Sequence, residues 1–261
     1  MGKVVAFSEF DAYYSKLPKS DAPVGTILDT NILISLSYEI ESNHEEVVDF
    51  FERIDRYGIQ YYATVSTKSE FLDFHRRLLI TENLRTLASA DSKFKIAAAA
   101  RAQIQVQSGQ LTRREQEGGD AIFTDTQIKK IKSVFSAARH SSQAGWLLIC
   151  ESFLRGRLVD VEQVLQARGI EYISQHDLAQ TELFHRKIDW PDARSISEVT
   201  CLGLSDSMIL NALQCSVCPF IISTDFDIGY ATLSSPPMKD VVMPDSLAKK
   251  YRSYHFDSIE T

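Results

Sequence analysis

Cysteine and long apolar runs are both scarce in this 261-residue sequence. It contains four cysteines, and no apolar stretch approaches the roughly 18 residues that a transmembrane helix needs. Four cysteines in a chain of this length give no disulfide framework, which predicts a reducing compartment, the cytoplasm. An acidic residue, Glu9, comes too early for a secretory signal peptide. We therefore expect an ordinary cytoplasmic globular protein that does not associate with membranes.

Several catalytic signatures are also missing. The sequence has no Walker phosphate loop, no GxGxxG turn and no GxSxG elbow, which disfavours nucleotide switches, dinucleotide enzymes and α/β-hydrolases. Its six histidines are scattered and form no HExxH pair. Cys215 and Cys218 form a CxxC pair, but no histidine lies close enough in sequence to complete a zinc site. We interpret these two cysteines as buried thiols.

Charge is unevenly distributed along the chain. The formal net charge is −7, whereas residues 84–168 carry 13 Lys and Arg against 8 Asp and Glu, a net charge of +5. A basic segment between acidic flanks indicates a surface for polyanions, although scattered cations on a solvated helix face explain it equally well. The candidate nucleic-acid contacts in this segment are Lys129, Lys130 and Lys132.

Short strand-like runs alternate with helical patterns outside this basic segment. The pattern predicts strands over 24–28, 59–65, 170–173, 220–222 and 241–243, and a helix over 176–190 that Pro191 closes. Such alternation predicts a three-layer α/β/α fold around a parallel sheet, formed by residues 24–83 and 169–261. Residues 1–23 are predicted to be a leader. Residues 84–168, which have almost no strand signals, are predicted to be a helical insertion.

Four carboxylates stand where apolar strands give way to helices or turns: Asp29, Glu70, Asp206 and Asp225. Ligands bind at the carboxyl ends of the strands in such sheets, so these side chains should gather there. A group of acids is costly unless hard cations neutralise it, and Mg²⁺ or Mn²⁺ suit oxygen ligands best. A metal beside a phosphodiester activates water and stabilises the leaving oxygen. The pattern therefore predicts a nuclease.

Each acid also has a purely structural explanation. Asp29 fits a helix N-cap, and Glu70 completes a capping box that starts at Thr67. Asp206 follows a serine cap, where the helix dipole favours an anion, and Asp225 lies in a turn. Taken singly, each acid is better explained by its structural role. Their recurrence at four strand ends favours a shared site.

These motifs together resemble the PIN-domain family of metal-dependent nucleases. The matching segments are Asp29-Thr30-Asn31, Ser66-Thr67-Lys68-Ser69-Glu70, Leu204-Ser205-Asp206-Ser207-Met208-Ile209-Leu210-Asn211-Ala212 and Ser223-Thr224-Asp225-Phe226-Asp227. The resemblance covers about residues 24–83 and 169–245. The chain departs from the family pattern in its late first strand, its long helical middle and a serine, Ser223, where threonine is more usual.

The resemblance implies a metal site and a reaction. Asp29, Glu70, Asp206 and Asp225 would bind one or two Mg²⁺ or Mn²⁺ ions, with Asp227 as an outer ligand. The residues that would position phosphate or hold these carboxylates are Asn31, Ser205, Ser223 and Thr224. The implied activity is that of a prokaryotic-like endoribonuclease acting on single-stranded or looped RNA. For short members of this family, the resemblance would imply a toxin held by an antitoxin. An inhibitory protein partner therefore stays open for this chain, and so does a homodimer.

Two other functions stay open. Structure-specific DNA nucleases use similar acidic sites under an arch of helices. The predicted helical insertion is consistent with that alternative. A PIN-like fold can also serve as an inactive binding or scaffold module. Metal-dependent cleavage of RNA, of DNA or of neither separates the three.

Overall fold

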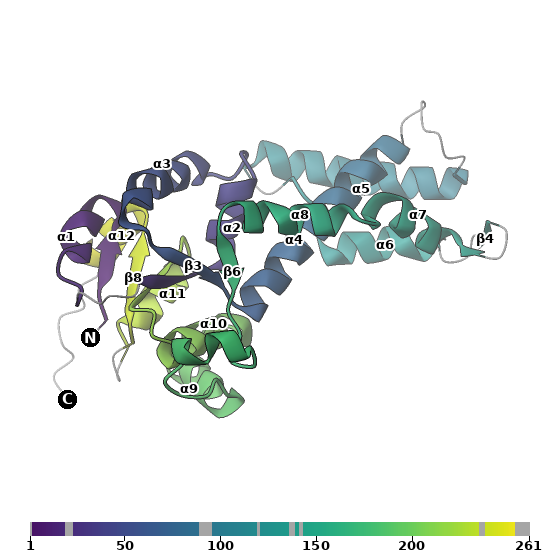
Figure 1. The fold of residues 1–261 in the computed structure, drawn as a ribbon. Helices are drawn as coiled ribbons and strands as arrows, with labels where there is room; N and C mark the ends of the chain where they lie inside the picture. The colour runs from purple at the N-terminus through teal and green to yellow at the C-terminus, as the bar shows by residue number, and fades with distance from the viewer. Residues whose placement is uncertain are drawn as a thin grey trace. The chain divides into compact units, whose positions relative to one another are not determined.

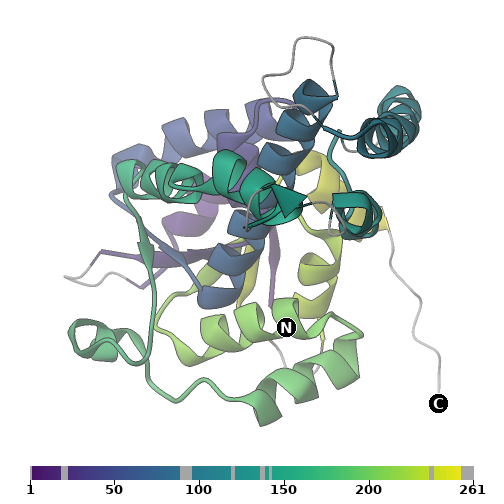
Figure 2. The ribbon, with the colours of Figure 1, turned by 90° about the vertical axis from the view of Figure 1, so that its right-hand side faces the viewer.

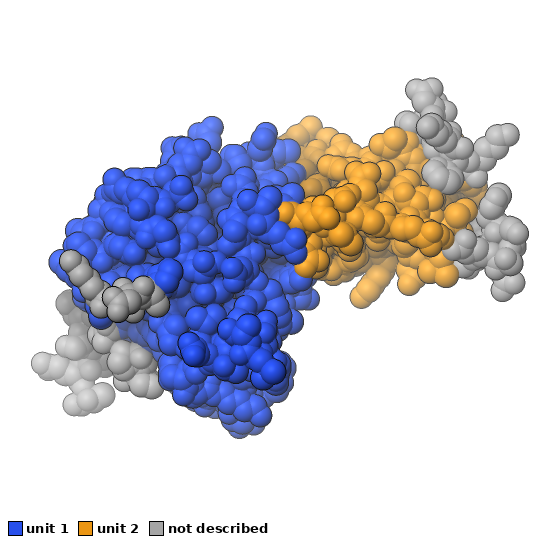
Figure 3. All heavy atoms as spheres, viewed as in Figure 1, with its two compact units in different colours: residues 1–71, 164–261 blue, residues 72–163 orange. Residues whose placement is uncertain are grey.

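The computed structural model describes residues 2–18, 23–88, 96–118, 121–135, 139–140, 143–234 and 238–253. The chain divides into two compact units: unit 1 comprises Met1–Phe71 and Val164–Thr261, and unit 2 comprises Leu72–Gln163 (Figure 3). Two helices, α4 (Val65–Leu87) and α8 (Arg157–Ala167), cross the boundaries. Among the described residues no helix is both long and apolar enough to cross a membrane.

Unit 1 is built around a six-stranded sheet in which every neighbouring pair of strands is parallel (Figures 1 and 2). Its order is β1 (Val4–Ala6), β8 (Asp240–Met243), β7 (Phe220–Ile222), β2 (Gly25–Leu28), β3 (Gln60–Ala63) and β6 (Ile170–Tyr172). The chain runs outward from β2 through β3 to β6, and outward on the other side from β7 to β8. The strand order therefore reverses between β2 and β7, and the pairing of Leu28 with Ile222 brings their carboxyl ends level.

The N-terminal segment belongs to this sheet, which differs from the predicted leader over residues 1–23. Strand β1 pairs with β8, with Val4 opposite Val241. The buried rings of Phe7 and Phe10 follow it, and the Phe10 ring packs edge-on against Phe50 at a centroid distance of 5.4 Å. The pairing with β8 and these aromatic contacts show that this segment is part of unit 1.

Helices cover both faces of the sheet, which confirms the predicted three-layer α/β/α fold with a parallel sheet. The α-helices that lie wholly in unit 1 are α1 (Phe10–Tyr14), α2 (Thr30–Ser37), α3 (His44–Ile54), α9 (Trp190–Thr200), α10 (Leu204–Cys215), α11 (Phe226–Thr232) and α12 (Asp245–Ser253). Parts of α4 and α8 also belong to unit 1, as do 3₁₀ segments at Phe7–Glu9, Asp55–Tyr57 and Leu178–Leu183. Helices α2 and α3 lie on one face, and α9 and α10 on the other (Figures 1 and 2). Side chains of one strand alternate between these layers. Ile221 of β7 clusters with Ile209 of α10, whereas its neighbour Phe220 contacts Phe10.

The segment before α9 differs from the predicted helix over 176–190. Residues Leu178–Leu183 form a short 3₁₀ helix, and α9 begins after an N-cap, Asp189, whose side chain accepts a hydrogen bond from the Asp192 amide at 3.0 Å. Pro191 lies in the first turn of α9. Proline is favoured there because its missing N–H has no intrahelical partner to lose. Pro191 therefore opens a helix instead of closing one.

Unit 2 is mainly helical and has a hydrophobic core of its own. Besides its parts of α4 and α8 it contains α5 (Ala98–Gln116), α6 (Asp125–Phe135), α7 (Gly145–Leu154) and a short antiparallel pair, β4 (Arg139–His140) with β5 (Gln143–Ala144). The core is formed by buried side chains such as Leu84 of α4, Ile104 of α5, Ile131 of α6 and Trp146 of α7. The helical character predicted for the middle segment agrees with this architecture.

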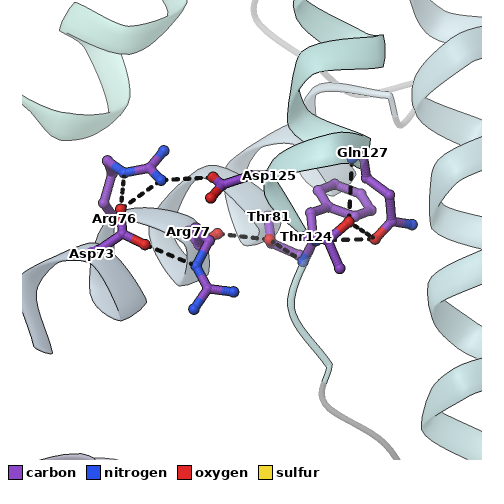
Figure 4. A network of polar contacts seen from close by, with 8 residues as sticks. Asp73, Arg76, Arg77, Thr81, Thr124, Asp125 and Gln127 are labelled. Atoms are coloured by element: carbon purple, nitrogen blue, oxygen red, sulfur yellow. Dashed lines mark hydrogen bonds and ion pairs between the residues drawn. The ribbon is translucent and has the colours of Figure 1, made fainter. Parts of the chain in front are cut away.

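A polar network within unit 2 fixes the start of α6 against α4 (Figure 4). Thr124 and Gln127 form a reciprocal capping box, because the Gln127 amide donates to Thr124 Oγ1 at 3.3 Å and Gln127 Oε1 accepts from the Thr124 amide at 3.0 Å. The Thr81 hydroxyl accepts from the Phe123 amide at 2.9 Å. The same network contains the ion pairs Arg76–Asp73, Arg77–Asp73 and Arg76–Asp125. These polar contacts are local to the helical unit.

Candidate active site

Asp29 lies at the carboxyl end of β2, beside the point where the strand order reverses. Its side chain is only 2% exposed; Oδ1 accepts from the Thr30 amide at 2.7 Å, and Oδ2 accepts from Ser223 Oγ at 2.8 Å. Asp29 is the N-cap of α2, which confirms its structural explanation. Burial, with smaller contributions from the charges of Asp225 and Asp206, raises the pKa of Asp29 to about 7, although the hydrogen bond from Ser223 lowers it. Capping therefore does not account for the whole environment of this carboxylate.

Ser223 connects Asp29 to a second carboxylate on the neighbouring strand. It follows β7 and is fully buried, and while its hydroxyl donates to Asp29 it also accepts from the Asp225 amide at 2.9 Å. Asp225 in turn caps α11 by accepting from the Asp227 amide at 2.7 Å. Burial raises the pKa of Asp225, and the charge of Asp227 adds to the rise. Thr224 between them is half-buried.

Glu70 reaches the same edge of the sheet from helix α4. Thr30 Oγ1 donates to Glu70 Oε2 at 2.6 Å, so Thr30 contacts Asp29 through its amide and Glu70 through its hydroxyl. The predicted capping box of Thr67 and Glu70 is wrong. Helix α4 begins directly after Thr64, whose Oγ1 accepts from the Thr67 amide at 3.1 Å, and Glu70 therefore stands more than one turn inside the helix. The structural explanation offered for Glu70 is thereby removed.

Asp206 lies in the first turn of α10. Gly203 is the N-cap of this helix, so Ser205, the predicted cap, stands inside the first turn instead. A Cβ atom on Gly203 would come within 3.2 Å of Asp206 Oδ2, which shows that the carboxylate folds back over the start of the helix. Burial raises the pKa of Asp206 to about 6, with smaller contributions from Glu70 and Asp225.

The predicted carboxylates form one electrostatic group, which we call the acidic group: Asp29, Glu70, Asp206, Asp225 and Asp227. Burial raises the pKa values of three of them, Asp29, Asp206 and Asp225, and repulsion from other members of the group adds to each rise. In the described ranges none of the five takes part in an ion pair. Nor do any three His, Cys, Asp or Glu side chains in that part of the chain converge closely enough to hold one metal ion. The group is a set of interacting carboxylates bridged by hydroxyls, not a closed coordination sphere.

The chemistry of these donors fits a hard divalent cation. All of them are carboxylate oxygens, the ligand type that Mg²⁺ and Mn²⁺ prefer. Mg²⁺ is typically held by only one or two carboxylates, with water and substrate phosphates completing its octahedron. A cage of three converging side chains is therefore not required. A cation would also offset the burial and the repulsion that together raise the pKa of Asp29 and Asp206.

The remaining predicted residues stand outside the hydrogen-bond network of the acidic group. Asn31 is exposed in the first turn of α2, and no hydrogen bond of its side chain occurs among the described residues. The three lysines Lys129, Lys130 and Lys132 belong to unit 2 and are exposed on α6. Their exposure leaves them accessible to a polyanion.

Thr30 is the site residue that the sequence alone did not single out. Its partner Glu70 lies 40 positions away, on a helix that follows a different strand. No local spacing rule reports such a contact. The available signal was a hydroxyl residue directly after the first acid, at the start of the helix.

No family model, curated protein or solved structure matches this chain. The resemblance to PIN-domain nucleases consequently rests on the four sequence motifs. The fold class rests on the structure itself, which has an all-parallel sheet covered by helices and an acidic group at the carboxyl edge of that sheet.

Proposed function

We propose that this protein is a metal-dependent endoribonuclease that hydrolyses single-stranded or looped RNA with the acidic group of unit 1. The observation that supports this most is the environment of Asp29. It is a buried carboxylate with a pKa near 7, and Thr30 and Ser223 link it to Glu70 and Asp225. The group stands at the reversal of strand order, where ligands bind in folds of this class.

The acidic group would hold Mg²⁺ or Mn²⁺, which supplies a Lewis acid for the phosphodiester and an activated water. The chain itself would fix the ligand oxygens. Ser223 orients Asp29 Oδ2 by donating to it, and the Thr30 hydroxyl orients Glu70 Oε2. Outer contacts of this kind commonly change metal affinity or activity by about 10- to 100-fold when they are removed. Asp206 and Asp225, whose pKa values are also raised, would supply further carboxylate oxygens to the cation.

Cleavage assays with a matched pair of variants test this proposal. Purified full-length protein is incubated with mixed single-stranded RNA and DNA in Mg²⁺, Mn²⁺ or EDTA. We expect RNA cleavage that requires metal, is abolished by Asp29→Asn and is unchanged by Asp49→Asn, which alters an exposed acid on α3. Cleavage of DNA alone would replace the proposal with a DNA nuclease.

Direct metal binding provides a readout that does not depend on the substrate. Titration with Mn²⁺, followed by electron paramagnetic resonance or calorimetry, should show one or two sites in the parent and in Asp49→Asn. Asp29→Asn should weaken binding by about tenfold or more, because it removes a charged ligand oxygen. A parent protein that binds no Mn²⁺ and cleaves neither nucleic acid would favour the inactive scaffold. The inhibitory partner, the homodimer and the cytoplasmic location stay predictions.

A further inference from the structure

Unit 1 contains a pocket of about 300 Å³ that is lined in part by α4 and α10, the helices that carry Glu70 and Asp206. Its wall is formed by the segments that follow β3 and β6 together with the start of α9 and one side of α10, and includes Val65, Ser66, Tyr172, His176, Trp190 and Met208. The pocket adjoins the acidic group through α4. Ser66 lines it, and Glu70 lies one helical turn further along the same face, with about 5–6 Å between such Cβ atoms.

A large exposed aromatic side chain, Trp190, stands at this pocket. It is 63% exposed, although tryptophan is among the residues that gain most from burial. Tyr172, 42% exposed, forms another part of the wall, and the Lys68 ammonium lies 5.6 Å from its ring centroid. The Tyr172 ring thus already has a cation over it. Trp190 is the aromatic surface best placed for a further ligand.

The backbone around Trp190 is held in place by hydrogen bonds from neighbouring segments. The Gln175 side chain donates to the Ile188 carbonyl at 3.3 Å and accepts from the Ile188 amide at 2.8 Å. The Asp189 carbonyl, next to Trp190, accepts from Asn211 Nδ2 of α10 at 2.6 Å. These bonds tie the start of α9 to the segment after β6 and to α10. The indole is therefore presented by a fixed backbone, which reduces the entropy that a ligand must overcome.

We propose that this pocket binds one nucleobase of the RNA, stacked on Trp190, and so places the adjoining phosphodiester at the acidic group; this inference rests on the proposed function. The volume lies at the lower end of the range for small-molecule pockets, which suits a single flat heterocycle. Bases stack on exposed aromatic rings in single-strand binding proteins with little sequence preference.

Binding of a ten-nucleotide single-stranded RNA and of an abasic oligomer of equal length tests the pocket. The measurements use fluorescence anisotropy in Ca²⁺ with full-length Asp29→Asn protein, so that cleavage cannot consume the probe. We expect Trp190→Ala to weaken RNA binding by about 5- to 100-fold and Trp190→Phe to retain most of it. Abasic RNA should bind the Asp29→Asn parent as weakly as ordinary RNA binds the Trp190→Ala variant. Trp190→Ala should not weaken the binding of abasic RNA any further. Leu178→Ala, an 88% exposed apolar residue outside the pocket, is the control.

Tryptophan fluorescence locates the base directly. The chain has two tryptophans, and Trp146 is buried in unit 2, so Trp146→Phe leaves Trp190 as the only reporter. RNA should quench it and abasic RNA should not. Equal affinity of RNA for the parent and for Trp190→Ala would overturn the pocket proposal.

Cleavage by the same variants separates this inference from the proposed function. In Mn²⁺, with Asp29 intact, Trp190→Ala should raise KM and leave the rate at saturating RNA largely unchanged. RNA cleavage that depends on Asp29 but is unaffected by Trp190→Ala would refute the base pocket and retain the nuclease. Base-dependent binding at Trp190 without any metal-dependent cleavage would refute the nuclease and retain the pocket.

Discussion

Replacing Asp29 by asparagine should stabilise the metal-free protein at alkaline pH. The substitution keeps the shape of the side chain and its capping oxygen. The amide oxygen of the new side chain can still accept from the Thr30 amide, and the Ser223 hydroxyl can turn to accept from the new NH₂ group while it still accepts from the Asp225 amide. What is lost is the buried negative charge.

The magnitude follows from the raised pKa of Asp29. An aspartate raised from 3.8 to about 7 disfavours the folded state at every pH above 7, and the penalty disappears as the pH falls below about 4. About three pKa units correspond to about 4 kcal/mol at pH 8. In the variant the buried Ser223 proton loses its carboxylate acceptor, which would offset about 1–2 kcal/mol of this. We therefore expect a net gain of about 2–3 kcal/mol at pH 8, and none at pH 4.

Urea unfolding in EDTA measures the difference, with Trp190 fluorescence in a Trp146→Phe background reporting on unit 1. The expected gain corresponds to a rise in Tm of about 5–10 °C. Asp49→Asn should change the free energy of unfolding by less than about 0.5 kcal/mol at either pH. Mn²⁺ at 100 times its Kd should stabilise the parent by about 2.7 kcal/mol and the Asp29→Asn variant much less. Equal stability of parent and variant at pH 8 would refute the reasoning, because Asp29 would then be no more than a cap.

Other substitutions test the supporting contacts. Thr30→Val, which removes the 2.6 Å bond to Glu70, should lower the cleavage rate by about 10- to 100-fold, and Thr30→Ser should restore it; equal rates for all three would contradict the role of this hydroxyl. Ser223→Ala removes a donor that lowers the pKa of Asp29, so the acidic limb of the pH–rate profile should move to higher pH, whereas Ser223→Thr should leave it in place. Reversing Lys129, Lys130 and Lys132 to glutamate should weaken RNA binding and reduce its salt slope by up to about 2; an unchanged slope would show that α6 does not contact phosphate.

The sequence is sufficient to predict the fold class and the meeting of Asp29 with Asp225, because both acids follow strands of one parallel sheet. The prediction that Asp206 stands at a strand end is wrong, since α10, which carries it, follows helix α9. Parallel strands end at the same edge, so residues that directly follow buried strands meet there irrespective of their separation in sequence. Asp29 after β2 and Asp225 after β7 obey this rule, and Ser223 joins them across 194 positions. The alternation of strand-like and helical runs likewise required no knowledge of tertiary contacts.

The remaining features depend on contacts that no local pattern encodes. Strand β1 is defined by its pairing with β8 at the opposite end of the chain. The sequence predicts that Pro191 ends a helix, but proline is also favoured in the first turn of a helix, where it stands in α9. The hydrogen bond from the Asp192 amide to the Asp189 side chain shows that a helix begins here. The sequence alone does not reveal that bond. Thr30 and Glu70 meet because two helices converge after different strands.

Helix capping explains where the acids stand but not why they are acids. Asp29 and Asp225 do cap α2 and α11, yet serine and asparagine cap helices about as well without a charge. A neutral cap at Asp29 would avoid a desolvation penalty of several kcal/mol and the repulsion from Asp225 and Asp206. Glu70 does not cap its helix at all, and no cation pairs with any of the acidic group among the described residues. In the proposed function a divalent cation, the ligand whose chemistry these oxygens match, would offset the cost of four buried or half-buried carboxylates at one sheet edge.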